Sequence, residues 1–398
     1  MRTRYKQALN RKRVMVGVGV GYGFGRDMIA GVVSYARAHG PWEFVGQITL
    51  VADAKAIRQA PAYDGLIFHF LDEEFGRAAI ERGTPAVSVG GDAVCAGISH
   101  VATDAEAIGE MAYDHLAGLG LTNFAVYGGR RPFRRRRLDA FAARVESNGQ
   151  PCVDLGQGSR HGWSSVAKNR QWSREVVRLK RRLKPLETRL GVFTWSSEDA
   201  RPLVAACDEL SIAVPDQLAV LGVDDDEAIC ELANPPISAI DHGCETVGWE
   251  AARMLDRLMA GDATDTSVLH VPPVRVVVRQ STDTLSIEDP LVVQAVRWIE
   301  ERLDQAIRVE DVLAELGVSR PTLEQRFRHT LGRTVHRHLI YARINRAKEL
   351  LLATDLDLAT ISVRCGFSYP SKFSTIFRRE TGSSPTDYRL NHRMRTGP

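Results

Sequence analysis

The chain has 398 residues, of which 44% are hydrophobic and 25% are charged. This composition is typical of soluble globular proteins and excludes disordered and fibrous classes, while the length allows two or three domains. No apolar run approaches the ~18 residues that a membrane helix requires, and the basic opening segment lacks the apolar core of a secretory signal. We therefore expect a cytoplasmic protein that does not contact a membrane.

The net charge of +3 conceals an uneven distribution of charge along the chain. Residues 290–398 contain 18 Lys and Arg residues against 12 Asp and Glu residues, so the rest of the chain is slightly acidic. An excess of positive charge suits contact with phosphates. The six cysteines are scattered, without a C-x-x-C pair or a histidine at metal-ligand spacing, and this predicts reduced thiols with no metal site and no cofactor.

Short apolar runs alternate with helical patterns from Val14 to about Arg279. The apolar runs predict buried strands at residues 14–20, 65–70, 85–89, 124–128, 190–195 and 218–223. The patterns between them predict helices that include residues 26–39, 104–119, 198–210 and 244–259. This alternation indicates an α/β fold with parallel sheets.

A polar stretch at residues 278–290, which ends in proline, separates the α/β region from an all-helical remainder. We place the domain boundary near residue 284. The sequence therefore predicts a domain of residues 1–283 and a second domain of residues 284–398.

The helical remainder begins with a helix-turn-helix pattern. One apolar-periodic helix ends at Gly317, Ser319 is placed to cap the next helix, and Leu323 and Phe327 have the i, i+4 spacing of a buried face. Two helices joined by so short a turn are typical of DNA-binding units.

The same construction occurs again towards the C-terminus, with Gly366 at the turn, Ser368 as the expected cap, and Phe373 and Phe377 on the buried face. Pro370 fits the first turn of this helix. Between the two units, an apolar stripe predicts one helix of about 18 residues, roughly 27 Å long. Two recognition helices at this spacing suit successive major grooves of DNA, which repeat every ~34 Å. The residues of the stripe are Ile340, Ile344, Ala347 and Leu351.

Residues 290–390 closely resemble the AraC-type DNA-binding domain. The shared strings are GVS-R-x-x-L-x-x-x-F from Gly317, R-x-x-x-A-x-x-L-L from Arg343, IS-x-x-CGF from Ile361, and F-x-x-x-F-R-R-x-x-G-x-SP-x-x-YR from Phe373. The resemblance implies a sequence-specific transcription regulator that binds double-stranded DNA.

Base contacts are expected from recognition-helix positions that point away from the buried stripe. Whether each one contacts a base, a phosphate or solvent stays open. The candidates are Arg320, Thr322, Glu324 and Gln325 in the first unit, and Ser371, Lys372 and Thr375 in the second. We expect nearby arginines to contact phosphates or other parts of the protein instead, namely Arg326, Arg328, Arg378 and Arg379.

Four strings in the α/β region resemble the LacI and periplasmic sugar-binding fold. They are Thr103-Asp104, the segment from Arg137 to Phe141 with Ala140 in place of the usual glycine, Gly222-Val223-Asp224, and Arg279-Gln280-Ser281-Thr282. The resemblance implies a two-lobed domain with a ligand cleft at the carboxyl ends of the strands. The expected fold class is therefore a two-lobed, LacI-type α/β domain followed by an all-α domain with two helix-turn-helix units.

Six residues are candidates to line the cleft. Tyr22 and Phe24 follow the first strand and suit stacking on a sugar face, whereas Trp195 is as compatible with the core as with stacking. Arg137 and Asp224 match ligand-binding positions of the resembled family, and Asp199 follows the strand at 190–195. Two carboxylates and an arginine suit adjacent hydroxyl groups.

Other acidic residues near the cleft have simpler interpretations. We favour Asp104 as a helix cap, and Asp225 and Asp226 as solvated side chains. The six arginines between residues 130 and 137 could bind a phosphorylated ligand or additional DNA, although a solvated helix face is the favoured interpretation. The glycines at 17–25 do not match G-x-G-x-x-G, and there is no Walker A string, nucleophile elbow or H-E-x-x-H, so no enzyme is expected.

The order of the two domains resembles the xylose operon regulator family, because a LacI-like domain without an N-terminal DNA-binding headpiece precedes an AraC-type domain. The resemblance implies an activator that responds to D-xylose and forms a homodimer, and RNA polymerase is a possible partner. Two alternatives remain open. One is a regulator that responds to another sugar or a phosphosugar, and the other is a cytoplasmic sugar-binding or sugar-processing protein whose basic tail is an interaction module.

Overall fold

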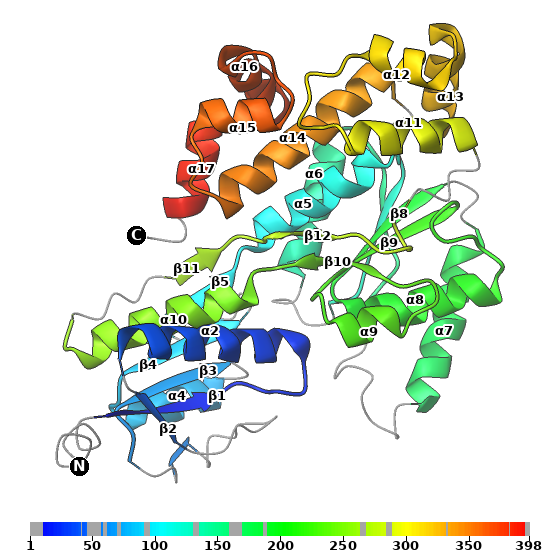
Figure 1. The fold of residues 1–398 in the computed structure, drawn as a ribbon. Coiled ribbons are helices and arrows are strands. Elements are labelled where there is room, and N and C mark those ends of the chain that lie inside the picture. The colour runs from blue at the N-terminus through cyan, green and yellow to red at the C-terminus, as the bar shows by residue number, and fades with distance from the viewer. Residues whose placement is uncertain are drawn as a thin grey trace.

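The computed structural model contains an α/β domain with two lobes and a helical domain (Figure 1). It describes residues 11–40, 42–45, 57–58, 62–69, 73–90, 96–129, 135–158, 169–185, 189–262, 268–283, 289–331, 333–381 and 383–394. Among these residues, no helix is long and apolar enough to cross a membrane. The predicted fold class is confirmed. The predicted boundary at 283/284 adjoins residues outside the described ranges and stays a prediction.

The first lobe is built on a parallel sheet with the strand order β11-β5-β4-β3-β1-β2. Its strands are β1 (Lys12–Gly17), β2 (Trp42–Val45), β3 (Gly65–His69), β4 (Ala86–Gly90), β5 (Ser99–Thr103) and β11 (Val268–Val271). Its helices are α2 (Gly23–His39), α4 (Glu73–Glu81) and α10 (Cys244–Met259). Helices α2 and α10 pack side by side on one face of the sheet and share a core with it, in which Val32 and Val247 are buried.

The second lobe has the strand order β12-β10-β9-β8-β6-β7, in which only the β10–β12 pair is antiparallel. Its strands are β6 (Phe124–Tyr127), β7 (Cys152–Asp154), β8 (Leu190–Thr194), β9 (Leu218–Val223), β10 (Ser238–Asp241) and β12 (Arg275–Val277). Its helices are α5 (Ala105–Gly118), α6 (Arg136–Ser147), α7 (Asn169–Leu183), α8 (Ser197–Glu209) and α9 (Glu227–Glu231). Helices α5 and α6 cover one face of this sheet, and α7 and α8 cover the other.

Three described segments cross from one lobe to the other. They lead from β5 to α5, from β10 to α10, and from β11 to β12. The first crossing begins at Asp104, whose side chain caps α5 by accepting from the backbone N–H groups of Glu106 and Ala107. This confirms the interpretation of Asp104 as a helix cap. Its own N–H donates to the carbonyl of Val271, so two of the crossings are joined.

The helical domain contains seven described helices. They are α11 (Pro290–Glu300), α12 (Val309–Leu316), α13 (Arg320–Leu331), α14 (Val335–Ala353), α15 (Leu358–Arg364), α16 (Pro370–Thr381) and α17 (Pro385–Met394). The first unit encloses Phe327, and the second encloses Phe373 and Phe377, each of them fully buried. Burying each ring contributes roughly 1.5–3 kcal/mol.

Helix α14 joins the two units, as its apolar stripe predicts. It has 19 residues, so it is about 28 Å long. Leu339, near its start, belongs to the first core, and Ala347, further along, belongs to the second. The buried Arg343 donates to the carbonyl groups of Gln305 and Ile307, which ties the middle of α14 to the first unit.

Both predicted turns contain a glycine in the left-handed region, Gly317 at φ 63° and Gly366 at φ 68°. Ser319 caps α13 as predicted, since its hydroxyl accepts from the N–H of Thr322. The prediction that Ser368 caps the second recognition helix is wrong. Helix α16 begins at Pro370 and its first turn bonds to the carbonyl of Tyr369, so Tyr369 occupies the capping position.

The described cysteines are free thiols, and Cys95 lies outside the described residues. Four of them are buried: Cys207, Cys230, Cys244 and Cys365.

Candidate ligand cleft and DNA-binding helices

The first lobe carries an aromatic pair at the edge of its sheet where the ligand cleft is predicted. Tyr22 immediately precedes α2 and Phe24 lies in its first turn, and their rings stack at 5.4 Å between centroids. Phe24 also lies 5.6 Å from the ring of His69, at the end of β3. Because strands β1 and β3 are parallel neighbours, these side chains gather at one edge of the sheet.

In the second lobe, Arg137 and Trp195 lie together. Arg137 is buried in the first turn of α6, and its Nη1 donates to the carbonyl of Trp195 at 3.2 Å. Its guanidinium group also lies over the indole ring, 5.0 Å from the centroid. Trp195 follows β8 and is half-buried, so it supports Arg137 and retains some exposed surface.

Asp199 is buried in the first turn of α8, where the hydroxyl of Ser196 accepts from its N–H. Two glycines leave room for its carboxylate. A Cβ atom at Gly128 or Gly158 would lie 2.6 or 2.1 Å from an Asp199 oxygen, which is too close for a side chain. Burial, followed by the charge of Asp199, raises the pKa of Tyr127. The carboxylate therefore lies against the end of β6.

Asp224 follows β9 in the left-handed region, with φ at 70°, and its Oδ1 lies 3.0 Å from Nε2 of His242. Burial opposes a charge on His242, but Cys244 and Asp224 outweigh this and raise the pKa of His242 to about 10. The imidazole is therefore protonated at neutral pH. The hydroxyl of Ser197 donates to the carbonyl of Asp224 and fixes the backbone there.

The same ring nitrogen of His242 also lies 3.0 Å from the sulfur of Cys244. A proton relay from a nucleophile to a carboxylate needs one partner on each ring nitrogen. Here both partners share Nε2, so the three side chains do not form a catalytic triad. Within the described ranges, no group of three or more His, Cys, Asp or Glu residues is arranged to hold a metal ion.

The interpretation of Asp225 and Asp226 as solvated side chains is wrong. Both are half-buried and paired: Asp225 with Arg279 at 2.7 Å, within the second lobe, and Asp226 with Arg26 at 3.0 Å, across the cleft. Gly23 also lies so close to Asp226 that a Cβ there would be 2.8 Å from the aspartate Cβ. The two lobes thus touch at this edge of the cleft.

The structure places all six predicted cleft residues at or just beyond the carboxyl ends of strands, or at the adjacent end of α6. Direct contacts join Tyr22 to Phe24 and Arg137 to Trp195. Sequence reasoning missed His242, which lies two residues after Ile240, because the segment at 237–240 contains Ser238 and was not recognised as a strand. It also missed Arg26, since its partner lies 200 residues away.

Most of the predicted DNA-contacting residues are exposed on the recognition helices. In α13, Arg320, Thr322 and Gln325 are exposed, and Arg320 pairs with Glu310 at 3.1 Å. Glu324 differs from the expectation of an exposed side chain: it is half-buried, because its position lies nearer to the packed face. Its Oε2 is buried without a hydrogen-bond partner among the described residues.

In α16, Ser371, Lys372 and Thr375 are exposed, while Phe373 and Phe377 of the same helix are buried. The hydroxyl of Thr375 donates to the carbonyl of Ser371 at 3.0 Å. The polar face of α16 is therefore separate from its packed face, as groove entry requires.

Arg326 was expected to contact phosphate or protein. It pairs with Asp289, the N-cap of α11, at 3.0 Å, and so supports the first unit from outside.

The comparisons with known proteins agree with this division into two parts. Residues 113–282 match the family described as periplasmic binding protein-like domain, and residues 312–391 match the helix-turn-helix domain family. The first match lies in the α/β domain and the second in the helical domain. The chain is thus a two-domain, DNA-binding transcription regulator.

The matches to complete proteins define the family more closely. The xylose operon regulatory protein of Haemophilus influenzae is 32% identical over 375 residues, which covers 92% of this chain and 95% of the relative. Its namesake from Escherichia coli K12 is 30% identical over 92% of this chain and 93% of the relative. A solved structure of the xylose-binding transcription activator XylR matches with a TM-score of 0.60 and 29% identity, over 96% of this chain and 98% of that one. The chain belongs to the xylose operon regulatory protein family, which comprises transcription regulators and not enzymes.

Proposed function

We propose that this protein is a cytoplasmic activator of D-xylose catabolic genes that binds the pentose in the cleft between its lobes. The observation that carries the proposal is the similarity to xylose operon regulatory proteins over 92% of the chain. The protein binds its operator as a homodimer and contacts RNA polymerase there. The chain divides, in this proposal, into a ligand-binding domain of residues 1–283 and a DNA-binding domain of residues 284–398.

In the cleft, the carboxylates of Asp199 and Asp224 accept hydrogen bonds from sugar hydroxyl groups, and Arg137 donates to a sugar oxygen. Tyr22 and Phe24 stack on the apolar face of the ring, and Trp195 supports Arg137. These roles suit a neutral polyol, which offers adjacent donors and acceptors and carries no charge.

The arginine run gives little support to a phosphosugar as the ligand. Among its described members, Arg135 pairs with Asp154 at 2.9 Å, and Arg136 lies 3.9 Å from Glu106. Arg137 already donates one of its N–H groups to the carbonyl of Trp195. Residues 130–134 lie outside the described ranges.

DNA is bound through α13 and α16, whose units are joined by α14, a helix about 28 Å long. This length suits two successive major-groove segments on one side of the duplex, with a repeat of ~34 Å. The base-contacting residues are taken from Arg320, Thr322, Glu324, Gln325, Ser371, Lys372 and Thr375. Sugar acts by binding the closed arrangement of the lobes more tightly than the open one. This difference in affinity is required, because a ligand that binds two states equally does not shift the equilibrium between them.

Two measurements on the full-length protein test the proposal. Calorimetry with D-xylose, D-ribose, L-arabinose and xylose 5-phosphate is expected to show the tightest binding for xylose. Fluorescence anisotropy with a labelled operator duplex is expected to show a change in operator affinity at saturating xylose. Tighter binding of the phosphosugar, or an operator affinity that xylose leaves unchanged, would overturn it. A variant truncated after residue 283 is tested for an electrophoretic mobility shift of operator DNA. If it still shifts this DNA, the helical domain is not the DNA-binding part.

A further inference from the structure

Helix α5 reaches from the lobe crossing to the helical domain. Its N-terminus is capped by Asp104, beside Val271 at the crossing from β11 to β12. Its other end lies under α14, the rod that joins the two helix-turn-helix units (Figure 1). The helix is therefore in contact with both the hinge between the lobes and the DNA-binding part of the molecule.

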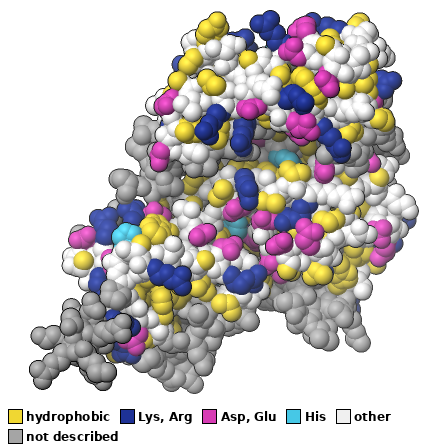
Figure 2. Space-filling model, in the orientation of Figure 1, with side chains coloured by type: hydrophobic (Ala, Val, Ile, Leu, Met, Phe, Trp, Pro, Cys, Tyr) yellow, Lys and Arg dark blue, Asp and Glu magenta, His cyan; other side chains and the backbone are white. Residues whose placement is uncertain are grey.

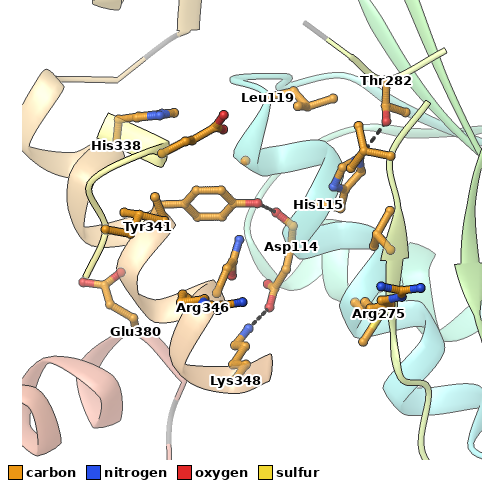
Figure 3. Close-up of a pocket in the computed structure, with 18 of the residues that line it drawn as sticks. Asp114, His115, Leu119, Arg275, Thr282, His338, Tyr341, Arg346, Lys348 and Glu380 are labelled. Atoms are coloured by element: carbon orange, nitrogen blue, oxygen red, sulfur yellow. Dashed lines mark hydrogen bonds and ion pairs between the residues drawn. The ribbon is translucent and has the colours of Figure 1, made fainter. Parts of the chain in front are cut away.

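Asp114, one turn before the end of α5, makes two contacts to α14. The hydroxyl of Tyr341 donates to its backbone carbonyl at 2.8 Å, and Nζ of Lys348 pairs with its carboxylate at 2.5 Å. Figure 3 shows both side chains extending from α14 towards Asp114. The ion pair is about one-fifth exposed at Lys348 and one-third exposed at Asp114. Partial burial makes such a pair stronger than one on the open surface.

The helical domain also approaches the backbone of the second lobe closely beside Asp114. A Cβ at Gly118 would lie 1.9 Å from the Tyr341 hydroxyl oxygen, and one at Gly120 would lie 2.1 Å from the Leu331 carbonyl oxygen. At the far side, Nη1 of Arg189 donates to the carbonyl of Thr330 at 3.0 Å. All of these contacts join the helical domain to the second lobe.

The remainder of this junction is not filled. A cavity of about 1040 Å³ extends between α5, β12 and the helical domain, and it includes His115, Arg275, His338 and Glu380 in its walls (Figure 3). Figure 2 shows charged side chains of both signs around the hollow between the helical domain and the lobes. Because apolar packing is interrupted here, the few polar contacts at Asp114 carry a larger share of the attachment.

We propose that Asp114 is a positioning residue that fixes α14 to the second lobe, so that both helix-turn-helix units follow this lobe when the cleft closes. This inference rests on the proposed sugar response and adds the contact through which the response reaches the DNA-binding domain. Since Arg343 ties α14 to the first unit and Ala347 to the second, one attachment on α14 positions both units.

The test compares the full-length protein with Asp114→Asn and Lys348→Gln, which remove the ion pair from opposite sides, and with Asp114→Asn/Lys348→Gln together. Asp139→Asn is the matched control, because Asp139 is an exposed aspartate on the neighbouring helix α6. Xylose affinity from calorimetry is expected to stay within twofold in all variants. The ratio of operator affinities with and without xylose is expected to fall at least fivefold in both single variants. In the double variant this ratio is expected to fall no further than in either single variant.

The inference is overturned if Asp114→Asn and Lys348→Gln keep the same ratio of operator affinities with and without xylose as the unaltered protein. It is also overturned if Asp139→Asn lowers this ratio as much as they do. If the unaltered protein shows no response to xylose, the proposed function fails, and a second measurement decides the inference by itself. Hydrogen exchange of the sugar-free protein is expected to be at least fivefold faster at the α14 amides of Asp114→Asn than in the unaltered protein. Unchanged exchange would show that Asp114 does not fix α14.

Discussion

The cleft between the lobes and the junction with the helical domain both contain histidines, but in opposite charge states. In the cleft, Cys244 and Asp224 overcome the effect of burial and raise the pKa of His242 to about 10. At the junction, burial lowers the pKa of His115 to about 4, and burial and Arg333 lower that of His338 to about 3. His242 is thus charged beside Asp224, whereas His115 and His338 at the junction are neutral over the physiological range.

The two regions also differ in what holds them closed. In the cleft, Arg26, whose side chain is 51% exposed, reaches Asp226 across the gap. At the junction, Tyr341 and Lys348 contact α5 from a helix that is part of two hydrophobic cores. This difference supports the proposal that the cleft is the moving part and that the helical domain follows the second lobe.

The largest effect is expected from Asp224→Asn in the cleft. Asparagine tolerates the left-handed backbone at this position, so the substitution removes the charge and keeps the fold of the loop. The protonated His242 then lacks its carboxylate partner, which costs on the order of 3–5 kcal/mol for a buried pair. We expect xylose affinity by calorimetry to fall at least 100-fold, and the midpoint of urea unfolding to decrease.

Glu227→Gln is the control for this substitution, because Glu227 is an exposed acid that begins the neighbouring helix α9. It should leave both measurements unchanged. Xylose binding by Asp224→Asn within threefold of the unaltered protein would remove Asp224 from the ligand site.

Acid is expected to weaken the junction before it weakens the cleft. The folded pKa values of His115 and His338 lie below the unfolded value of about 6.5, so the unfolded chain binds more protons and stability falls as the pH decreases below 6.5. From these two histidines together we expect a loss of about 3 kcal/mol between pH 6.5 and pH 5, measured by urea unfolding. His242 behaves in the opposite way: its contribution is complete below about pH 6.5 and is lost as the pH rises through about 10.

His338→Phe distinguishes the junction from other sources of acid sensitivity. The two ring nitrogens of His338 are buried without a hydrogen-bond partner among the described residues, so phenylalanine removes a titrating group and no hydrogen bond. The variant should lose less stability than the unaltered protein between pH 6.5 and pH 5. His336→Gln, at an exposed position two residues earlier on α14, should keep the original pH dependence. Equal pH profiles for all three proteins would contradict the assignment.

The elements that could be predicted from the sequence are those whose own apolar side chains mark the buried face. The all-apolar strand β9 and helix α14, with its apolar stripe, could be predicted because their hydrophobic patterns are visible in the sequence of each segment alone. Strand β5 was missed because it contains polar residues that tertiary contacts satisfy: Ser99 is buried, and His100 bonds to Ser88 of the next strand at 2.7 Å. Strand β10 was missed for the same reason, since Ser238 bonds to Ser281.

The parts of the site that escaped prediction depend on distant pairing. Candidate residues such as Asp224 follow strands, and the parallel sheet places strand ends together, so their positions could be inferred. The pairing of Asp114 with Lys348 spans 234 residues, and that of Arg26 with Asp226 spans 200. Neither pair has a sequence pattern, because the contact exists only after the domains have been packed.

The smallest predicted effect concerns the Arg26–Asp226 pair, which tests whether the cleft is the moving part. A half-exposed ion pair contributes about 0–1 kcal/mol, so Arg26→Gln and Asp226→Asn are each expected to weaken xylose binding no more than about fivefold, by favouring the open lobes. The double variant should match the single variants, because one interaction is lost in each case. Lys12→Met and Asp256→Asn form the control, since that pair, at 2.8 Å, lies within the first lobe and does not cross the cleft. If substitutions in the Lys12–Asp256 pair change xylose affinity as much as those in the Arg26–Asp226 pair, closure does not depend on the contact between the lobes. If the effects of Arg26→Gln and Asp226→Asn add in the double variant, the two side chains act separately on sugar binding.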